Sequence, residues 1–289
     1  MYIHAVRREL FITSTGRDRM HDRLKWDYVA YYVFMHAIGL YGLWCAYAYA
    51  SAAIVWFSIG YFFFGHLAIT CGAHRLYSHE SYHASTALQY IYVLGFSAVA
   101  QGPVVWWVGK HRQHHARTDL DGDPHSPRNG FFHAHMGWLM RERHGNPAPP
   151  QYTRHFWRGG GKTYTAALWQ LRYYRVLVPA MTLGVPTLFG FIIGETMNGL
   201  LVGGFARVVV QYHLTWIVNS LGHSDNGPHG SAANHWLLAI PTVGESFHAN
   251  HHERPRSYRL GSHWYDVDLG YYMIKLCMLV GLAREHQRV

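Results

Sequence analysis

Two adjacent stretches without a charged side chain restrict this fold more than any other feature of the sequence. From Tyr28 to Ala50, and again from Ser51 to Ala73, the chain contains no Lys, Arg, Asp or Glu. Each stretch is about 23 residues long, which as a helix is enough to cross roughly 30 Å of hydrocarbon. Two further apolar stretches, 174–194 and 199–219, are separated by a short polar turn. The sequence therefore predicts an all-α integral membrane protein with four transmembrane helices.

Histidine is the strongest compositional anomaly, at 24 of 289 residues, and three short motifs hold eight of these histidines. Two motifs have the spacing HxxHH, and offsets of three and four residues lie on one face of a helix. The motif histidines are His74, His79, His111, His114, His115, His248, His251 and His252. A zinc ion usually takes four ligands in total, so eight imidazoles indicate a site that holds two metal ions. Imidazole-rich sites suit Zn, Cu, Fe or Ni.

Other polar residues are candidates for the same site. Asn219 and His223 are four residues apart at the end of the fourth apolar stretch, so they point the same way on a helix. His223 is a candidate ninth ligand, and Asn219 is expected to reach a metal only through water. Four carboxylates are expected to hold ligand rings by accepting their free N–H groups. They are Asp119, Asp121, Asp123 and Glu245.

A fifth apolar segment, 87–108, lies between the first two histidine motifs and contains Gly95, Gly102 and Pro103. If this segment crossed the membrane, the two motifs would lie on opposite sides and could not share metals. We therefore expect a re-entrant or interfacial segment. Residues 28–283 are predicted to form one domain, in which segments 109–173 and 220–283 make up the cap. Residues 1–27 and 284–289 are the predicted tails.

The positive charges indicate which side the cap occupies. The formal net charge is +9, which alone would suit nucleic acid or a membrane surface. All 25 Lys and Arg residues except Arg207 fall in residues 1–27, 74–175 and 254–289. The positive-inside rule then predicts both termini and all three motifs on the cytoplasmic side. This topology explains the basic surplus without nucleic acid, and Arg207 is expected to face protein or a polar cavity.

One competing motif is HExxH, at His79-Glu80-Ser81-Tyr82-His83. On a helix it would present two zinc ligands and a general base, as in a metalloprotease. This interpretation leaves His74 and both HxxHH motifs unexplained. A rival from another class is a membrane protein that transports or stores metal, which predicts ligands at mid-membrane depth. The spans hold only His36, His66 and His213, which disfavours that interpretation.

With three histidine motifs in this order, the chain resembles the membrane-bound fatty acyl desaturases, in particular the Δ9, stearoyl-CoA desaturase-like group. The resemblance covers roughly residues 28–283. It extends to Asp123-Pro124-His125-Ser126-Pro127, Trp216-Ile217-Val218-Asn219-Ser220 and Gly244-Glu245-Ser246-Phe247-His248.

The resemblance implies four membrane helices beneath a cytoplasmic cap that holds two Fe ions, with O₂ as co-substrate. It implies nine ligands, the eight motif histidines and His223, with Asn219 acting through water. It also implies a kinked acyl tunnel near whose bend lie Gln101, Trp107 and Thr215. The implied reaction introduces a cis double bond into a saturated fatty acyl chain, with electrons from a ferredoxin or from cytochrome b5 and its reductase. A hydroxylase on the same di-iron site is the nearest alternative enzyme.

Several positions depart from the acyl-CoA enzymes of this group. Gly109 stands where those enzymes carry an Arg, and Glu80 and Glu142 stand where they carry basic residues. Arg141 and Arg143 are possible substitutes that contact a headgroup. The acyl carrier therefore stays open among a membrane lipid, CoA and acyl-carrier protein, in a bacterial inner membrane or an ER-type membrane.

Overall fold

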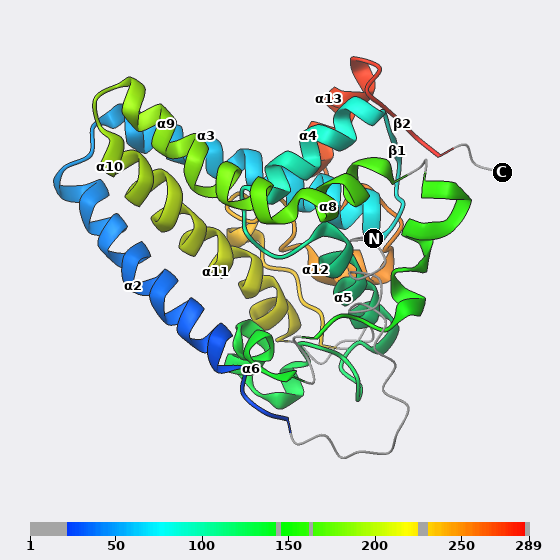
Figure 1. The fold of residues 1–289 in the computed structure, drawn as a ribbon. Coiled ribbons are helices and arrows are strands. Elements are labelled where there is room, and N and C mark those ends of the chain that lie inside the picture. Colours follow the sequence, from blue (N-terminus) through cyan, green and yellow to red (C-terminus); the bar gives the residue numbers. More distant parts are fainter. Residues whose placement is uncertain (1–21, 143–145, 162–163, 225–230, 287–289) are drawn as a thin grey trace.

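The computed structural model describes residues 22–142, 146–161, 164–224 and 231–286. Within these residues, four helices are long and apolar enough to cross a membrane: Trp26–Ala48, Ala52–Ser78, Thr165–Ile192 and Thr196–His223. The predicted fold class of four spans and a helical cap with a histidine-rich site is confirmed. Figure 1 shows the long helices together on one side and the shorter cap helices on the other.

The first hairpin consists of α2 (Trp26–Ala48) and a helix that begins as α3 (Ala52–Leu67) and continues as the π-helical η1 (Ala68–Ser78). Ser51 caps α3, because its hydroxyl accepts a hydrogen bond from the N–H of Ile54 at 3.4 Å. The second helix thus runs five residues beyond the apolar stretch that predicted it. Those extra residues carry the first histidine motif into the cap.

The second hairpin consists of two interrupted helices. The first contains α8 (Thr165–Pro179), η6 (Ala180–Gly184) and α9 (Val185–Ile192); the second contains α10 (Thr196–Asn198), η7 (Gly199–Ala206), α11 (Arg207–Ser220) and η8 (Leu221–His223). The side chain of Glu195, in the turn, accepts a hydrogen bond from the N–H of Ser51 at 3.1 Å. The turns of both hairpins therefore meet at the same end of the bundle, away from the histidine motifs.

The segment predicted to be interfacial forms two short helices, α4 (Thr86–Ser97) and α5 (Val104–Arg117). Neither is long enough to cross a membrane, and α4 packs against η1 and α8. A buried core, which includes Tyr77, Phe96, Val108 and Ile274, joins these elements to α13 (Leu269–Leu279). This core holds the first two histidine motifs beside each other.

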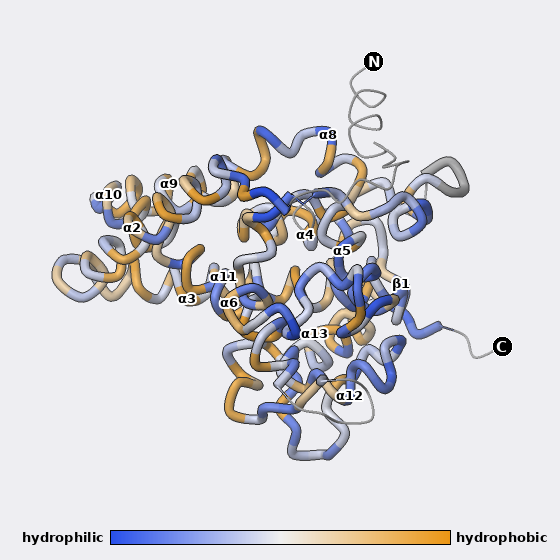
Figure 2. The backbone as a smooth tube through the Cα atoms, turned by 90° about the horizontal axis from the view of Figure 1, so that it is seen from below, coloured by the Kyte–Doolittle hydropathy of each residue, from blue (hydrophilic) through white to orange (hydrophobic). Residues whose placement is uncertain are grey.

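The rest of the cap is built from short elements. They are η2 (Pro127–Asn129), α6 (Phe131–His135), η3 (Gly137–Met140), η4 (Pro150–Tyr152), η5 (Arg154–Gly161), η9 (Trp236–Leu238), α12 (His248–Glu253), β1 (His83–Ala84) and β2 (Ala283–Arg284). The two strands pair antiparallel, with His83 opposite Arg284. Hydrophilic residues gather around α12, whereas α3 and α9 are mainly hydrophobic (Figure 2).

Arg207 lies inside the fourth span, as the sequence indicated, and it faces protein. Its guanidinium donates to the carbonyls of Gly203 and Ala98 at 2.7 and 2.9 Å and to the side-chain oxygen of Gln211 at 2.9 Å. It also lies over the ring of Tyr61, 4.8 Å from the centroid. These contacts satisfy a cation that would be costly in lipid.

Candidate metal centre

The first histidine motif depends on π-helical geometry. Its two histidines are five residues apart, and a π-helix bonds residue i to residue i+5. The N–H of His79 donates to the carbonyl of His74 at 3.2 Å, which is such a bond. The two imidazoles consequently lie on the same side, with ring centroids 4.9 Å apart. An ordinary α-helix would turn His79 away from His74.

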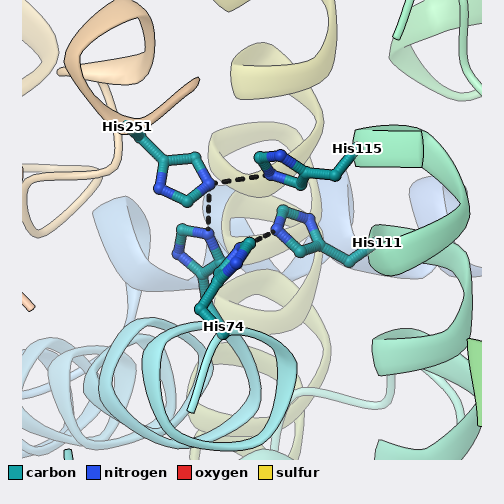
Figure 3. A group of neighbouring side chains, drawn as sticks. His74, His111, His115 and His251 are labelled. Atoms are coloured by element: carbon teal, nitrogen blue, oxygen red, sulfur yellow. Dashed lines mark hydrogen bonds between the residues drawn. The ribbon is translucent and has the colours of Figure 1, made fainter. Parts of the chain in front are cut away.

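The other two motifs lie on α5 and α12, where the HxxHH spacing faces one way. The α12 helix is short, and Asn234 holds its first turn by accepting hydrogen bonds from the N–H groups of Ala249 and Asn250 at 3.0 and 3.3 Å. Figure 3 shows side chains of all three motifs converging from separate helices. His74 comes from η1, His111 and His115 from α5, and His251 from α12.

The nine predicted ligands form two groups, in each of which the candidate ligand atoms lie within 4.8 Å of one another. One group contains His74, His79, His111, His115 and His251; the other contains His114, His223, His248 and His252. Contacts within the first group include His74 to His251 at 3.0 Å and His79 to His111 at 2.7 Å, both between Nε2 atoms. In the second group, Nε2 of His248 lies 2.9 Å from that of His223 and 3.1 Å from that of His252.

The hydrogen-bond partners of two imidazoles indicate which ring nitrogen is free to bind a metal. Nδ1 of His74 lies 2.6 Å from a carboxylate oxygen of Glu245, and Nδ1 of His114 lies 3.0 Å from both oxygens of Asp123. An ionised carboxylate can only accept, so in both neutral rings Nδ1 carries the hydrogen and Nε2 is bare. The Nε2 atoms of His74 and His114 point at those of His251 and His252. The ligand atoms of each group lie within 4.8 Å of one another, so the donor set fits bound metal ions.

The carboxylates are themselves held in place. Glu245 contacts the hydroxyl of Thr70 and lies 3.6 Å from the guanidinium of Arg75. Burial opposes ionisation, but His74 and Arg75 outweigh it and lower the pKa of Glu245 to about 2. Asp123 accepts from the N–H groups of Asp119 and His125 at 2.9 and 3.2 Å. Glu245 is thus an ionised acceptor at neutral pH, and two backbone donors hold Asp123 in place.

Burial also favours the neutral form of several of these imidazoles. It lowers the pKa of His115 to about 3, with further lowering by neighbouring histidines. Burial likewise lowers the pKa of His111, His248 and His251 well below the usual value. Neutral imidazole is the form that binds a metal, so the electrostatic environment suits the donor set.

A cavity of about 620 Å³ is mainly apolar and has His111 in its lining. We call it the apolar pocket; its volume lies within the usual range for small-molecule sites. The predicted substrate residues Gln101, Trp107 and Thr215 all line it, as does Asn219. The indole of Trp107 stacks on His111 at 5.2 Å, and the Gln101 amide donates to the hydroxyl of Thr215 at 2.8 Å. These two contacts fix the shape of the pocket close to the metal centre.

Comparison with known protein families identifies the chain. The family model described as fatty acid desaturase matches residues 54–276. The chain belongs to the fatty acid desaturase family. All nine predicted metal ligands lie inside the matched region.

Individual relatives support this assignment. The chain is 34% identical over 273 residues to acyl-CoA desaturase 1 of Saccharomyces cerevisiae, covering 93% of this chain and 52% of the relative. It is 31% identical over 269 residues to the sn-1 stearoyl-lipid 9-desaturase of Synechocystis, covering 90% and 79%. It is 32% identical over 279 residues to the sn-2 palmitoyl-lipid 9-desaturase of Nostoc, covering 91% and 90%. The chain thus spans about half the length of the yeast relative and most of the two bacterial ones.

The structure contradicts one interpretation of the sequence. The HExxH motif is not helical, because η1 ends at Ser78, Glu80 has φ 52° and His83 begins β1. His79 faces the other motifs, whereas His83 is exposed and pairs with His286, so the zinc-protease alternative is wrong. Arg141, a candidate for headgroup contact, is not among the residues that line the apolar pocket. It lines a separate cavity of about 760 Å³ and contacts a carboxylate oxygen of Asp22 at 3.2 Å. Arg143 lies outside the described residues.

Some residues of the desaturase site were not singled out from the sequence. The hydroxyl of Ser231 lies 3.1 Å from Nδ1 of His223. Lys110 lines the apolar pocket, and it carries no motif signal beyond its place beside His111. Burial and the nearby ammonium of Lys25 lower the pKa of Lys110 to about 7.

Proposed function

We propose that this desaturase holds two iron ions and uses O₂ to introduce a cis double bond, at the Δ9 position, into a saturated fatty acyl chain. The observation that carries the proposal is the junction of two facing histidine groups with a pocket of about 620 Å³. Removing hydrogen from an unactivated methylene is beyond any side-chain acid or base, so a metal must supply the oxidising power.

The residues proposed to hold the ions are the nine histidines, five in one group and four in the other, with Asn219 contributing through water. The protein's own contribution is positional. Glu245 and Asp123 fix the tautomers of His74 and His114, so that Nε2 is presented to the metal. The ring of Trp107 and the Gln101–Thr215 hydrogen bond hold the pocket wall beside His111 and thereby select which methylene pair lies nearest.

The proposal includes a direction in the membrane and a reductant. The positive-inside rule favours both termini and the metal centre on the cytoplasmic side, because the turns near Ser51 and Glu195 carry no Lys or Arg. Each double bond requires two electrons in addition to those of the substrate, when O₂ is reduced to water. A ferredoxin or cytochrome b5 with its reductase is the proposed source.

The test is expression in cells that lack their own desaturase, followed by fatty-acid profiling. We expect new monoenes with a defined bond position, and none from the His251→Ala variant, which should also lose its iron. Unchanged lipids, despite iron loading and a working reductant, would refute the proposal. Hydroxylated acids in place of monoenes would assign the same site to a hydroxylase.

A further inference from the structure

The helix α13 is apolar on two opposite faces, and only one of them packs against the protein. The inner face is buried and repeats at helical spacing through Gly270, Ile274 and Cys277. The exposed apolar residues repeat at the same spacing on the outer face, which consists of Tyr272, Leu276, Leu279 and Val280. Leu279 is 83% exposed. A contiguous apolar face of this kind indicates contact with a membrane or with another protein.

The depth of α13 follows from its contacts with the second membrane helix. About 20 helical residues cross the hydrocarbon of a bilayer, and counted from Ala52 they end near Cys71. The thiol of Cys71 donates to the carbonyl of Gly270, at the start of α13, at 3.5 Å. Cys277, two turns further along α13, also lies near Cys71 in the buried core. The helix thus stays level with the end of the hydrocarbon, as a helix lying in the membrane plane would.

The helix is held firmly in this position. Asp268 caps α13 by accepting a hydrogen bond from the N–H of Tyr271 at 3.0 Å. The same carboxylate accepts hydrogen bonds from both terminal nitrogens of Arg75, at 2.8 and 3.1 Å. Arg75 is itself buried in η1. Because this buried ion pair fixes the start of α13 to η1, the helix cannot turn its outer face inward, and a partner outside the chain must cover that face.

The residues that flank the outer face suit a membrane surface. The only charged residue of α13 is Lys275, whose ammonium lies 3.5 Å from a carboxylate oxygen of Glu285. A lysine at the edge of an interfacial helix can extend its charge to the headgroups or to water. Trp264 and Tyr265, shortly before the helix, are 86% and 60% exposed. Exposed Trp and Tyr are typical of the level at which lipid headgroups lie.

We propose that α13 is an in-plane membrane helix, whose outer face lies at the boundary between the headgroups and the acyl chains of the lipid bilayer. The other possible occupant is a second copy of the chain. Lipid is favoured because the face is level with the end of the second span. Exposed apolar side chains, such as Tyr173 and Val176 on α8, also lie at the cap end of the third span. The inference does not rest on the chemistry proposed above.

The experiment measures the depth of single fluorescent labels on the full chain in lipid nanodiscs. One leucine at a time is replaced by cysteine and labelled with bimane. The variants are Leu276→Cys and Leu279→Cys on the outer face, Leu188→Cys within the third span, and Leu120→Cys in the cap, all at exposed positions. The wild type is the labelling blank, because its three cysteines, Cys45, Cys71 and Cys277, are buried.

Three quenchers distinguish the possible positions of each label. Lipids brominated near the glycerol end of their acyl chains should quench Leu276→Cys and Leu279→Cys most strongly. Lipids brominated near the methyl end should quench Leu188→Cys most strongly. Neither lipid should quench Leu120→Cys, which iodide in the water should quench instead. The two outer-face variants test the same face independently, and both replace exposed side chains, so neither leaves a cavity in the core.

Three results would overturn the proposal. Quenching of the outer-face labels by iodide, to the extent seen in Leu120→Cys, would show that α13 lies in water. Protection from iodide and from both lipids would show that protein, such as a second copy of the chain, covers the face. Quenching chiefly by bromine near the methyl ends would place the face in the middle of the bilayer. None of these results depends on monoene formation, so the proposed function is tested separately.

Discussion

Two clusters of histidines among the described residues differ in how their rings contact one another. The metal centre gathers nine imidazoles whose contacts run from Nε2 to Nε2. A second cluster joins three helices through His36 of α2, His213 of α11 and His135 of α6, which we call the histidine relay. Nε2 of His36 lies 3.1 Å from Nε2 of His213, and Nδ1 of His213 lies 3.0 Å from Nε2 of His135.

The relay can satisfy every hydrogen bond without a cation. Nδ1 of His36 lies 2.6 Å from the carbonyl of Tyr32 and must donate to it, so its Nε2 accepts from His213. His213 then accepts from His135, and Nδ1 of His135 accepts from the hydroxyl of Ser220 at 3.0 Å. Three neutral rings complete the chain. In the metal centre, carboxylates instead fix Nδ1 of His74 and of His114, so that both rings turn Nε2 toward a group of converging Nε2 atoms. The clusters therefore differ in that nine imidazoles converge through Nε2 in one, whereas three are linked in a chain in the other.

The largest expected effect follows from removing one histidine from each cluster. His251→Ala should abolish iron binding and monoene formation together, because its Nε2 faces both His74 and His115, at 3.0 and 2.8 Å. His213→Ala should retain a full complement of iron. Elemental analysis measures the iron content of the two purified variants, and fatty-acid profiling measures monoene formation. Equal loss of iron from His251→Ala and His213→Ala would show that the two clusters do not differ in metal binding.

A smaller effect is expected from the carboxylates that back the metal centre. Glu245→Gln keeps the shape of the side chain but loses the charge beside His74, and iron affinity should fall by about 10–100-fold. Competition with a chelator gives the affinity. Glu195→Gln is the matched control, because Glu195 holds the two membrane turns together far from the metal centre. An unchanged affinity in Glu245→Gln would mean that this carboxylate does not orient its ligand.

Much of this architecture could be predicted from the sequence, for reasons visible in particular residues. Uncharged runs indicate membrane spans because charge is costly in lipid, and the HxxHH spacing indicates shared faces because α-helices repeat every 3.6 residues. The relative orientation of His74 and His79 could not be predicted, because an α-helix is the default expectation. Their five-residue spacing places both side chains on one side only in a π-helix. Contacts between distant segments carry no local pattern. The pairing of Arg141 with Asp22, the burial of Lys110 and the meeting of His36 with His213 therefore required the structure.

The relay should contribute to stability rather than to iron binding. His213→Ala leaves Nε2 of His36 and Nε2 of His135 without a partner, each on a half-buried ring, and we expect a loss of about 1–3 kcal/mol in the free energy of unfolding. Thermal unfolding in detergent measures this loss. The control His263→Ala removes an exposed ring, for which the loss should be within about 0.5 kcal/mol. Equal stability of the two variants would show that the relay is not formed.

The smallest expected effect concerns protonation of the relay. Burial, followed by repulsion from His213 and His36, lowers the pKa of His135 to about 4. The unfolded chain takes up this proton near pH 6.5, so the contribution of neutral His135 to stability is complete above that pH and is lost as pH falls toward 4.

A fully buried group would lose about 1.4 kcal/mol per pH unit, and screening of the half-buried ring reduces this loss. Between pH 7 and pH 5 the wild type should therefore lose about 1 kcal/mol more than His135→Gln. Because all other titrating groups are shared, parallel pH profiles for the two proteins would mean that His135 titrates normally and that the relay, unlike the metal centre, does not keep its rings neutral.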